Sequence, residues 1–325
     1  STKDIIASIL SQKYKVLKTE GNYNNEIGLP LTILKLKDHQ AMVVEMGMSA
    51  FGEISLLTNI AKPTVAVITI IGSSHIGELG SRENILKAKL EILEGLDDHG
   101  CVIINNDNDL LHSWYENNTD NHKHITYGIE NKSMLMAKNI ILKEKSSEFS
   151  IEYDEKSYNV EVPVAGKHYI YNTLAAICVG IKYGISMDEI IKGVLEFELT
   201  KRRMEILKKE NGATIINDSY NASYESTKAA LDYLGSTNNY PKIAVLGDIL
   251  ELGEFSKQMH ENVGKEAMNI SEKAIELGMN RNNVYQYLTN DMAIDKIKEL
   301  QSANSIILVK ASNGMHFNEI IEAIK

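Results

Sequence analysis

The sequence has very little cysteine and no long hydrophobic run. Only two of its 325 residues are cysteine, Cys101 and Cys178, and both lie in apolar stretches. We interpret them as reduced core thiols, not as a disulfide framework or a metal knuckle. No apolar run reaches the roughly 18 residues of a membrane span, and no signal peptide opens the chain. These absences favour a cytoplasmic protein without a membrane span.

The chain also has fewer basic residues than acidic residues. The chain has 34 lysine and arginine residues against 44 aspartate and glutamate residues, and its formal net charge is −10 at pH 7. Because nucleic-acid-binding surfaces are basic, this balance argues against a nucleic-acid partner. The length and the 43% hydrophobic content allow about two domains, each with a substantial core.

Short apolar strands alternate with amphipathic helices along most of the chain, which predicts an α/β fold with parallel sheets covered by helices. The expected strands are 41–48, 64–71, 101–105, 214–217, 243–247 and 305–310. The expected helices are 4–10, 81–94, 171–183, 187–197, 224–234 and 256–268. Residues 138–163 alternate apolar and polar side chains, which indicates a small antiparallel excursion. A second βα series begins near residue 200, where we place a domain boundary.

Lys89 occupies an unusual position for a lysine. It lies four residues after Ile85 and four before Leu93, within the apolar stripe of the helix expected over 81–94 and capped by Ser81. Desolvation lowers the pKa of a buried ammonium, and the neutral amine can form a Schiff base or a carbamate. The lysine can instead pair with an acid. A further alternative is a stem that follows the edge of the core while the ammonium stays in water.

Two polar residues follow apolar strands that we expect to be neighbours. Glu45 comes after Val43 and Val44, and His75 comes shortly after the strand 64–71. The carboxyl ends of parallel strands face the ligand crevice, so the two side chains together suggest a divalent metal. Oxygen ligands favour Mg²⁺ over Zn²⁺. The alternatives are an acid that accepts hydrogen bonds from a neighbouring turn and a structural histidine.

These residues resemble, in order and spacing, the central domain of the Mur ligases, which build the peptide stem of bacterial peptidoglycan. The resemblance rests on residues 19–30 (Thr-Glu-Gly-Asn-Tyr-Asn-Asn-Glu-Ile-Gly-Leu-Pro), Glu45-Met-Gly, His75 and Ala88-Lys89-Leu-Glu-Ile. It implies a central P-loop-type parallel-sheet ATPase domain over 1–199 and a Rossmann-like C-terminal α/β domain over 200–325. It also implies that Lys89 is carbamylated and that Glu45, His75 and Lys89 form the catalytic Mg²⁺ site.

The second half of the chain carries further segments similar to Mur ligase motifs. These are 165–176 on the adenine side, 200–205 with an inter-domain arginine, 217–222 at the start of the C-terminal domain, and 245–254 with His260 downstream. The residues implied in nucleotide binding are His168, Asn172, Arg203 and Asp218. The residues implied in substrate binding are Asn22, Asn24, Asn25, Tyr220, Asn221 and Ser312.

Segment 245–254 (Val-Leu-Gly-Asp-Ile-Leu-Glu-Leu-Gly-Glu) most resembles the family member that adds D-Ala-D-Ala to UDP-MurNAc-tripeptide. The implied activity uses ATP to phosphorylate the tripeptide carboxylate, and the dipeptide amine then attacks the acyl phosphate. We expect a hinge near 199–203 to close the C-terminal domain over the substrates. Another amino-acid ligase of the superfamily and a nucleotide-binding homologue without ligase activity remain alternatives. We expect a monomer, although no sequence signal bears on the oligomeric state.

The chain departs from the Mur ligase pattern in several places. Family members have a Gly-rich P-loop directly before the residue that matches Ser1, so we expect that loop and the domain that grips the UDP moiety to precede Ser1. We also expect a strand and a turn to be missing near 268–270. The substituted positions are Ile70 for asparagine, Arg202 for glycine, Ser223-Tyr224 for Asn-Pro, Ala311 for glycine and Asn313 for arginine.

Overall fold

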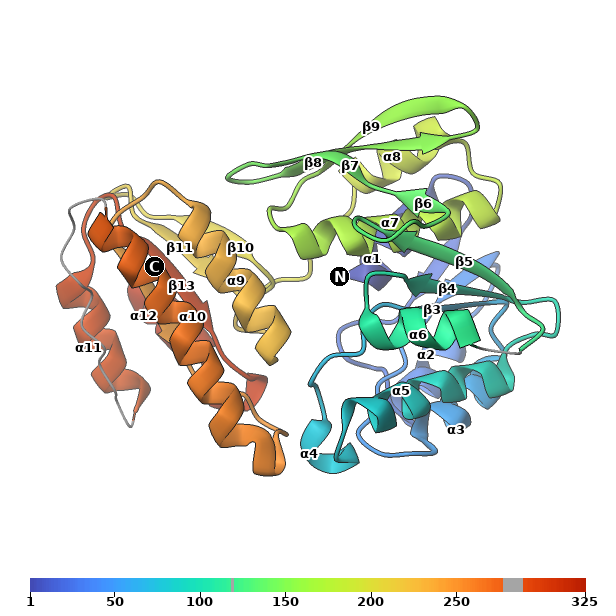
Figure 1. The fold of residues 1–325 in the computed structure, drawn as a ribbon, viewed down its shortest axis with the longest axis horizontal. Coiled ribbons are helices and arrows are strands. Elements are labelled where there is room, and N and C mark those ends of the chain that lie inside the picture. Colours follow the sequence, from blue (N-terminus) through green and yellow to red (C-terminus); the bar gives the residue numbers. More distant parts are fainter. Residues whose placement is uncertain (118–119, 277–288) are drawn as a thin grey trace. The chain divides into compact units, whose positions relative to one another are not determined.

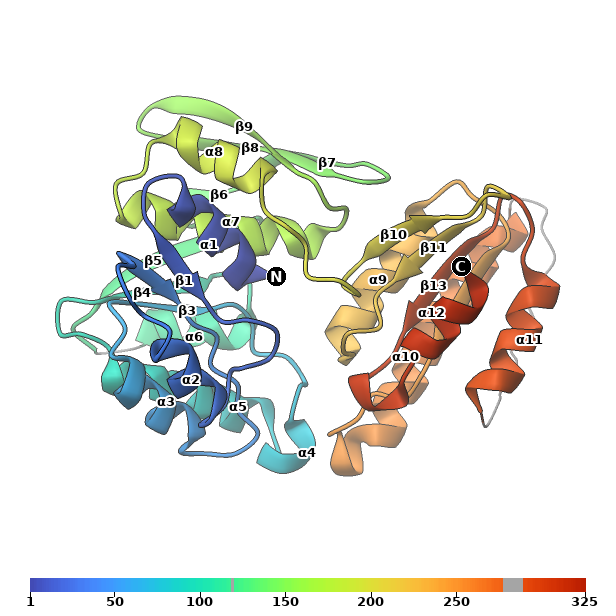
Figure 2. The same ribbon diagram turned by 180° about the vertical axis from the view of Figure 1, so that it is seen from behind.

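The computed structural model describes residues 1–117, 120–276 and 289–325. The chain divides into two compact units (Figures 1 and 2). The first unit comprises Ser1–Ile71 and Glu78–Thr200, and the second comprises Gly72–Gly77 and Lys201–Lys325. Among the described residues, no helix has both the length and the apolar character needed to cross a membrane.

Parallel strands form the centre of the first unit. Strand β1 (Val16–Lys18) pairs with β2 (Ala41–Val43), and a four-stranded parallel sheet follows the order β3 (Val65–Ile68), β4 (Cys101–Asn105), β5 (Lys123–Gly128) and β6 (Leu135–Met136). Every residue of β4 is buried, as expected for a parallel strand that is covered on both faces. The helices are α1 (Thr2–Ser11), α2 (Gly28–Ile33), α3 (Glu53–Ala61), α4 (Ile76–Leu79), α5 (Arg82–Leu90), α6 (Asp109–Asn117), α7 (Lys167–Lys182) and α8 (Met187–Leu195).

A separate antiparallel sheet confirms the excursion predicted over 138–163. It consists of β7 (Lys138–Leu142), β8 (Ser147–Tyr153) and β9 (Lys156–Val162), with β8 in the middle. Figure 1 shows it beside α8, above the parallel strands of the same unit. Alternate residues of β9 are buried, because only one face of this sheet meets the core.

The second unit has its own mixed sheet, with strand order β10 (Glu205–Lys208), β11 (Thr214–Asn217), β13 (Ile306–Lys310) and β12 (Lys242–Leu246). Strand β10 is antiparallel to β11, whereas β11, β13 and β12 run parallel. The carboxyl ends of these three strands therefore meet at one edge, with β13 between the other two. The helices of this unit are α9 (Tyr224–Ser236), α10 (Ser256–Glu276), α11 (Asn290–Leu300) and α12 (Asn318–Ile324).

The predicted α/β fold with parallel sheets is confirmed, but several predicted elements are shorter than expected, among them the strand predicted over 64–71, which spans only Val65–Ile68. The strand predicted over 41–48 ends at Val43, because the next backbone amides bond to the loop 19–24 instead of to a strand. The helix predicted over 81–94 ends at Leu90 and continues as a 3-10 turn over Glu91–Gly95. Ser81 is its N-cap, as predicted, and its hydroxyl accepts the amide of Asn84 at 3.2 Å.

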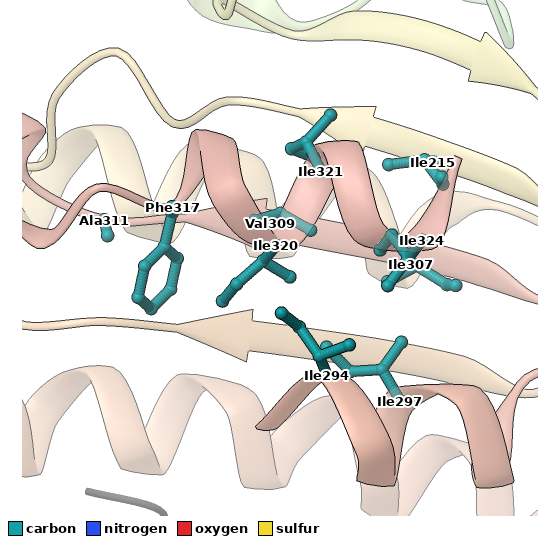
Figure 3. Packing of buried hydrophobic residues seen from close by; sticks show 10 residues of the cluster. All are labelled: Ile215, Ile294, Ile297, Ile307, Val309, Ala311, Phe317, Ile320, Ile321 and Ile324. Atoms are coloured by element: carbon teal, nitrogen blue, oxygen red, sulfur yellow. The ribbon is translucent and has the colours of Figure 1, made fainter. Parts of the chain in front are cut away.

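An aliphatic cluster holds the second unit together (Figure 3). Side chains of α11 and α12 pack against β13, where Ile307 and Val309 are fully buried. The cluster consists of Ile215, Ile294, Ile297, Ile307, Val309, Ala311, Phe317, Ile320, Ile321 and Ile324. Because it contains no charged side chain, its contribution to stability is that of apolar burial and close packing.

We predict that Ile307→Ala lowers the free energy of unfolding of the second unit by about 2–5 kcal/mol, since a cavity in a closely packed core cannot collapse fully. Met292→Ala is the matched control, because Met292 is half exposed on α11, and it should change stability by less than about 0.5 kcal/mol. Hydrogen exchange of the β11 and β13 amides measures both effects. Equal losses for the two variants would show that the cluster is not the core of this unit.

Candidate active site

The loop 19–25 and the residues after β2 form one polar assembly in the first unit. The amide of Glu45 donates to Thr19 Oγ1 at 3.0 Å, and the side-chain amide of Asn24 donates to Glu45 Oε1 at 3.0 Å. Thr19 itself is fully buried, and its own amide donates to the Val43 carbonyl at 3.0 Å. The bond from Asn24 therefore orients the Glu45 carboxylate through one of its oxygens.

Gly47 allows this assembly to close. Its amide donates to the Asn24 carbonyl at 2.8 Å, and a Cβ at this position would lie 2.8 Å from the Asn24 side-chain nitrogen. Any side chain there would push Asn24 away from Glu45. Asn25 has a different task, because its side-chain oxygen accepts the amide of Gly28 at 2.8 Å at the start of α2. Asn22 is exposed, and its carbonyl accepts the Asn24 amide at 2.7 Å.

Lys89 and Glu45 influence each other electrostatically. Desolvation lowers the pKa of the Lys89 ammonium, and the nearby Glu45 carboxylate offsets part of that shift. The predicted apolar stripe holds only in part, because Ile85 is buried while Leu93 and Lys89 itself are intermediate. The surroundings of the amine, and not complete burial of the residue, therefore favour its neutral form.

The predicted metal ligand His75 lies in the short stretch Gly72–Gly77 that groups with the second unit. Its φ is +63°, in the left-handed region that non-glycine residues seldom adopt. Its Nδ1 atom lies 2.7 Å from Glu251 Oε2, and the Gly77 amide donates to the Glu251 carbonyl at 3.0 Å. The predicted ligand therefore adjoins the 245–254 motif, a neighbour that the sequence did not indicate.

The donor set of the first unit is compatible with Mg²⁺. In the part of the chain that the structure describes, no group of three or more histidine, cysteine, aspartate or glutamate side chains could hold a metal. Mg²⁺ differs from Zn²⁺ in keeping several waters and substrate phosphates as ligands, so it needs only one or two protein carboxylates. Glu45 provides one, and a carbamate on the Lys89 amine would provide a second.

The predicted nucleotide residues of the first unit lie at the start of α7. His168 packs against Tyr169, with ring centroids 4.5 Å apart, and Gly166 before it has a φ of +118°. Asn172, one turn further on, accepts a hydrogen bond from Thr2 Oγ1 at 3.0 Å. The start of α1 is thus tied to the start of α7, two helices that are far apart in the sequence.

The predicted residues of the second unit gather where β11 and β13 end. Asp218 Oδ1 accepts the amide of Met204 at 3.1 Å, and Asp218 Oδ2 accepts Lys310 Nζ at 2.5 Å. The guanidinium of Arg203 lies 4.0 Å from the centre of the Tyr220 ring, a cation–π contact. The carboxylate of Asp218 thus makes two contacts within the second unit, and its contact with nucleotide stays a prediction.

Ser312 and Asn221 complete this edge. Ser312 is buried, and its hydroxyl accepts the amide of Leu250 at 2.9 Å, while its own amide donates to the Asp248 carbonyl at 3.2 Å. Asn221 is exposed, and its carbonyl accepts a bond from Lys310 Nζ at 3.1 Å. Roles in substrate binding for these two residues stay predictions.

Two residues of these assemblies were missed from the sequence. Thr19 acts through a hydroxyl in a loop without periodicity, so no pattern marks it. Lys310 had a visible signal, because it ends the apolar run Ile-Ile-Leu-Val, and a lysine there needs a buried partner. Lys310 could have been identified in the same way as Lys89, as a lysine within an apolar pattern.

The fold and these residues define a two-unit α/β protein with a lysine–carboxylate site in the first unit and charged loops at the carboxyl edge of the second sheet. Residues 1–180 match the model of the Mur ligase middle domain, and residues 202–313 match that of the Mur ligase glutamate ligase domain. The chain belongs to the Mur ligase family.

Its similarity to individual members extends over nearly the whole chain. The UDP-N-acetylmuramoyl-tripeptide–D-alanyl-D-alanine ligase of Bacillus subtilis is 38% identical, with 99% of this chain and 72% of the relative covered. A MurF crystal structure from Acinetobacter baumannii superposes with a TM-score of 0.88 at 30% identity, over 99% of this chain and 73% of that one. MurF from Thermotoga maritima in complex with ADP gives 0.87 at 27% identity, over 99% and 76%.

We predict that the Lys89 amine takes up CO₂ as a carbamate, since its lowered pKa leaves neutral amine available. Carbon-13 NMR of protein equilibrated with labelled bicarbonate should show one carbamate signal that is lost in Lys89→Ala and fades as the pH falls, because protonated amine does not react. Lys87→Ala is the matched control, because Lys87 is exposed on the same helix. A signal that persists in Lys89→Ala, or none in the parent protein, would contradict the prediction.

Proposed function

We propose that this protein is an ATP-dependent ligase that joins D-Ala-D-Ala to UDP-MurNAc-tripeptide in the synthesis of peptidoglycan precursors. The observation that carries the proposal is the 38% identity, over 99% of this chain, to a relative named for that reaction. The ADP complex of the similar T. maritima MurF supports ATP as the nucleotide. The proposed substrates, ATP and a UDP-linked precursor, support a cytoplasmic location.

The chemistry required explains the kinds of residues in the site. A carboxylate is a poor electrophile, so the tripeptide carboxylate first receives the γ-phosphoryl group of ATP. The amine of D-Ala-D-Ala then attacks the acyl phosphate, the C–O bond to phosphate breaks, and phosphate leaves with the amide formed. Little covalent chemistry falls to the protein, whose contribution is positioning and electrostatic stabilisation.

Mg²⁺ would be held by Glu45 and by the carbamate of Lys89, and when bound it would neutralise the phosphate charges. A role of His75 as a further ligand stays a prediction. Asn24 holds the Glu45 carboxylate in one orientation, which is the usual task of a residue that supports a metal ligand. A neutral Lys89 amine serves this site better than an ammonium, because an ammonium would repel the cation.

The residues we propose for the nucleotide are His168, Asn172, Arg203 and Asp218. His168 lies within the first turn of α7, and a Cβ on the preceding Gly166 would lie 2.7 Å from its ring. Arg203 offers a guanidinium that already stacks on Tyr220, so less side-chain entropy is lost when it meets a phosphate or an adenine ring. For the peptide substrates we propose Asn22, Asn24, Asn25, Tyr220, Asn221 and Ser312.

Another amide-forming ligase of the superfamily is the second candidate. A pseudomurein peptide ligase from Methanothermus fervidus shares the fold, with a TM-score of 0.76 at 21% identity. The choice between the candidates depends on the acceptor, because the steps up to the acyl phosphate are the same for all of them.

We therefore predict that the full-length protein, given ATP, Mg²⁺ and UDP-MurNAc-tripeptide, releases phosphate when D-Ala-D-Ala is added and not when single amino acids are added. Phosphate release and mass spectrometry of the product measure this. Turnover with D-glutamate or another single amino acid would assign the protein to a sister ligase. No turnover with any acceptor would refute the proposal.

We further predict that Asn24→Ala raises the Mg²⁺ concentration for half-maximal activity about 10–100-fold, the usual effect of removing a partner of a metal ligand. The physical reason is the lost hydrogen bond to Glu45 Oε1. Asn59→Ala is the control, since Asn59 is an exposed residue of the same unit whose amide donates to its own helix. An unchanged Mg²⁺ requirement in Asn24→Ala would show that Glu45 is not a metal ligand.

A further inference from the structure

Lys310 is a charged residue buried at the end of the central strand of the second sheet. Its relative exposure is 2%, although it follows four aliphatic residues of β13. Its ammonium donates to Asp218 Oδ2 at 2.5 Å and to the Asn221 carbonyl at 3.1 Å, and both acceptors follow β11. A lysine desolvated to this degree is held in place by its partners, and its partners are held by it.

The other oxygen of Asp218 leads to the turn 202–204. Asp218 Oδ1 accepts the Met204 amide at 3.1 Å, next to Arg203 in the chain. Arg202 and Met204 have φ values of +65° and +52°, in the left-handed region, so two strained residues flank Arg203. Such backbone persists only where its surroundings fix it.

The same network fixes the aromatic partner of Arg203. The Tyr220 amide donates to the Arg202 carbonyl at 3.0 Å, and Tyr220 stands between Asp218 and Asn221, the two acceptors of Lys310. One ammonium therefore holds both ends of the segment that places the Tyr220 ring 4.0 Å from the Arg203 guanidinium.

We propose that Lys310 is a positioning residue that acts through Asp218 and Asn221 to hold Arg203 and Tyr220 in place for the nucleotide. The role in nucleotide binding rests on the proposed function, whereas the positioning of Arg203 and Tyr220 does not. Lys310 touches no reacting atom in this account. Its task is to keep a strained turn in a single conformation.

Burial of a lysine in this sheet does not by itself require such a network. Lys242 begins β12 at the opposite, amino edge, with a relative exposure of 7%, and its ammonium donates to the Gly235 carbonyl at 2.7 Å. Lys242 lies far along its strand from the 202–204 turn. It therefore provides a matched control for the general effect of losing a buried ammonium.

The first test is proteolysis of the native full-length protein by trypsin, which cleaves after Lys201, Arg202 and Arg203. Lys310→Met should raise the rate of cleavage in this turn about tenfold, and Lys242→Met should leave it unchanged. Cleavage after Lys228 on α9 reports unfolding of the whole unit, and Lys310→Met should not raise the rate of this cleavage. A parallel rise at both places, or the same result for the two variants, would show a merely structural role and overturn the proposal.

A second variant keeps the test independent of overall stability. Asp218→Asn retains an acceptor for the Met204 amide and removes the carboxylate that Lys310→Met leaves uncompensated. Trypsin should therefore cleave the turn more slowly in the double variant Lys310→Met/Asp218→Asn than in Lys310→Met alone. Equal or faster cleavage would contradict a path through Asp218.

Steady-state kinetics test whether the turn 202–204 contributes to nucleotide binding. In the full-length ligase, Lys310→Met should raise KM for ATP about tenfold with kcat changed less than about twofold, the pattern of lost binding and not of lost chemistry. Lys242→Met should keep both constants. A lower kcat at unchanged KM would overturn the assignment of the turn to nucleotide. A parent protein without turnover would refute the proposed function, and the proteolysis would still decide the positioning role.

Discussion

A lysine ammonium that leaves water must find acceptors or release its proton, and both units contain lysines subject to this constraint. Lys310 has acceptors, because a carboxylate oxygen and a backbone carbonyl both lie within hydrogen-bond distance. For Lys89 the pKa is lowered despite Glu45, since desolvation outweighs the attraction of one carboxylate. The first solution gives a fixed cation that organises loops. The second gives an amine available for chemistry, and the difference lies in the number of acceptors supplied.

The order of the parallel strands explains why Lys310 can organise so much of the second unit. Strand β13 lies between β11 and β12, so residues just past its end reach the loops on both sides. Lys310 reaches the Asn221 carbonyl after β11, and Ser312 accepts the Leu250 amide after β12. The positions of these loops are thus set by the most buried strand of the sheet, and the aliphatic cluster beneath β13 supports them.

Patterns of apolar residues predicted the strands that are apolar along their whole length, and missed a strand that begins with polar residues. Strands β4 and β11 have the predicted bounds, whereas β5, which begins with Lys123 and His124, was missed because its first half is polar. Lys89 and Glu45 were both expected near a ligand from their places in the pattern. The hydrogen bond from Asn24 to Glu45 was not foreseen, because it depends on the conformation of a loop whose polar residues have no period.

Two departures from the Mur ligase pattern explain each other in the structure. The family has glycine where this chain has Arg202, and the φ of +65° there is a conformation that suits glycine and costs other residues about 1–2 kcal/mol. The Arg202 guanidinium offsets part of that cost by donating to the Ser219 carbonyl at 3.2 Å and to Asn313 Oδ1, since hydrogen bonds of charged groups contribute about 1.5–3 kcal/mol. Asn313 in turn replaces the arginine of the family pattern. One position gains a guanidinium and its hydrogen-bonded partner loses one, so the pair of loops keeps its charge. Reversing only the change at Asn313 would add a cation beside a strained Arg202 that has lost this acceptor. Reversing only the change at Arg202 would leave Asn313 without this donor and the two loops one cation short.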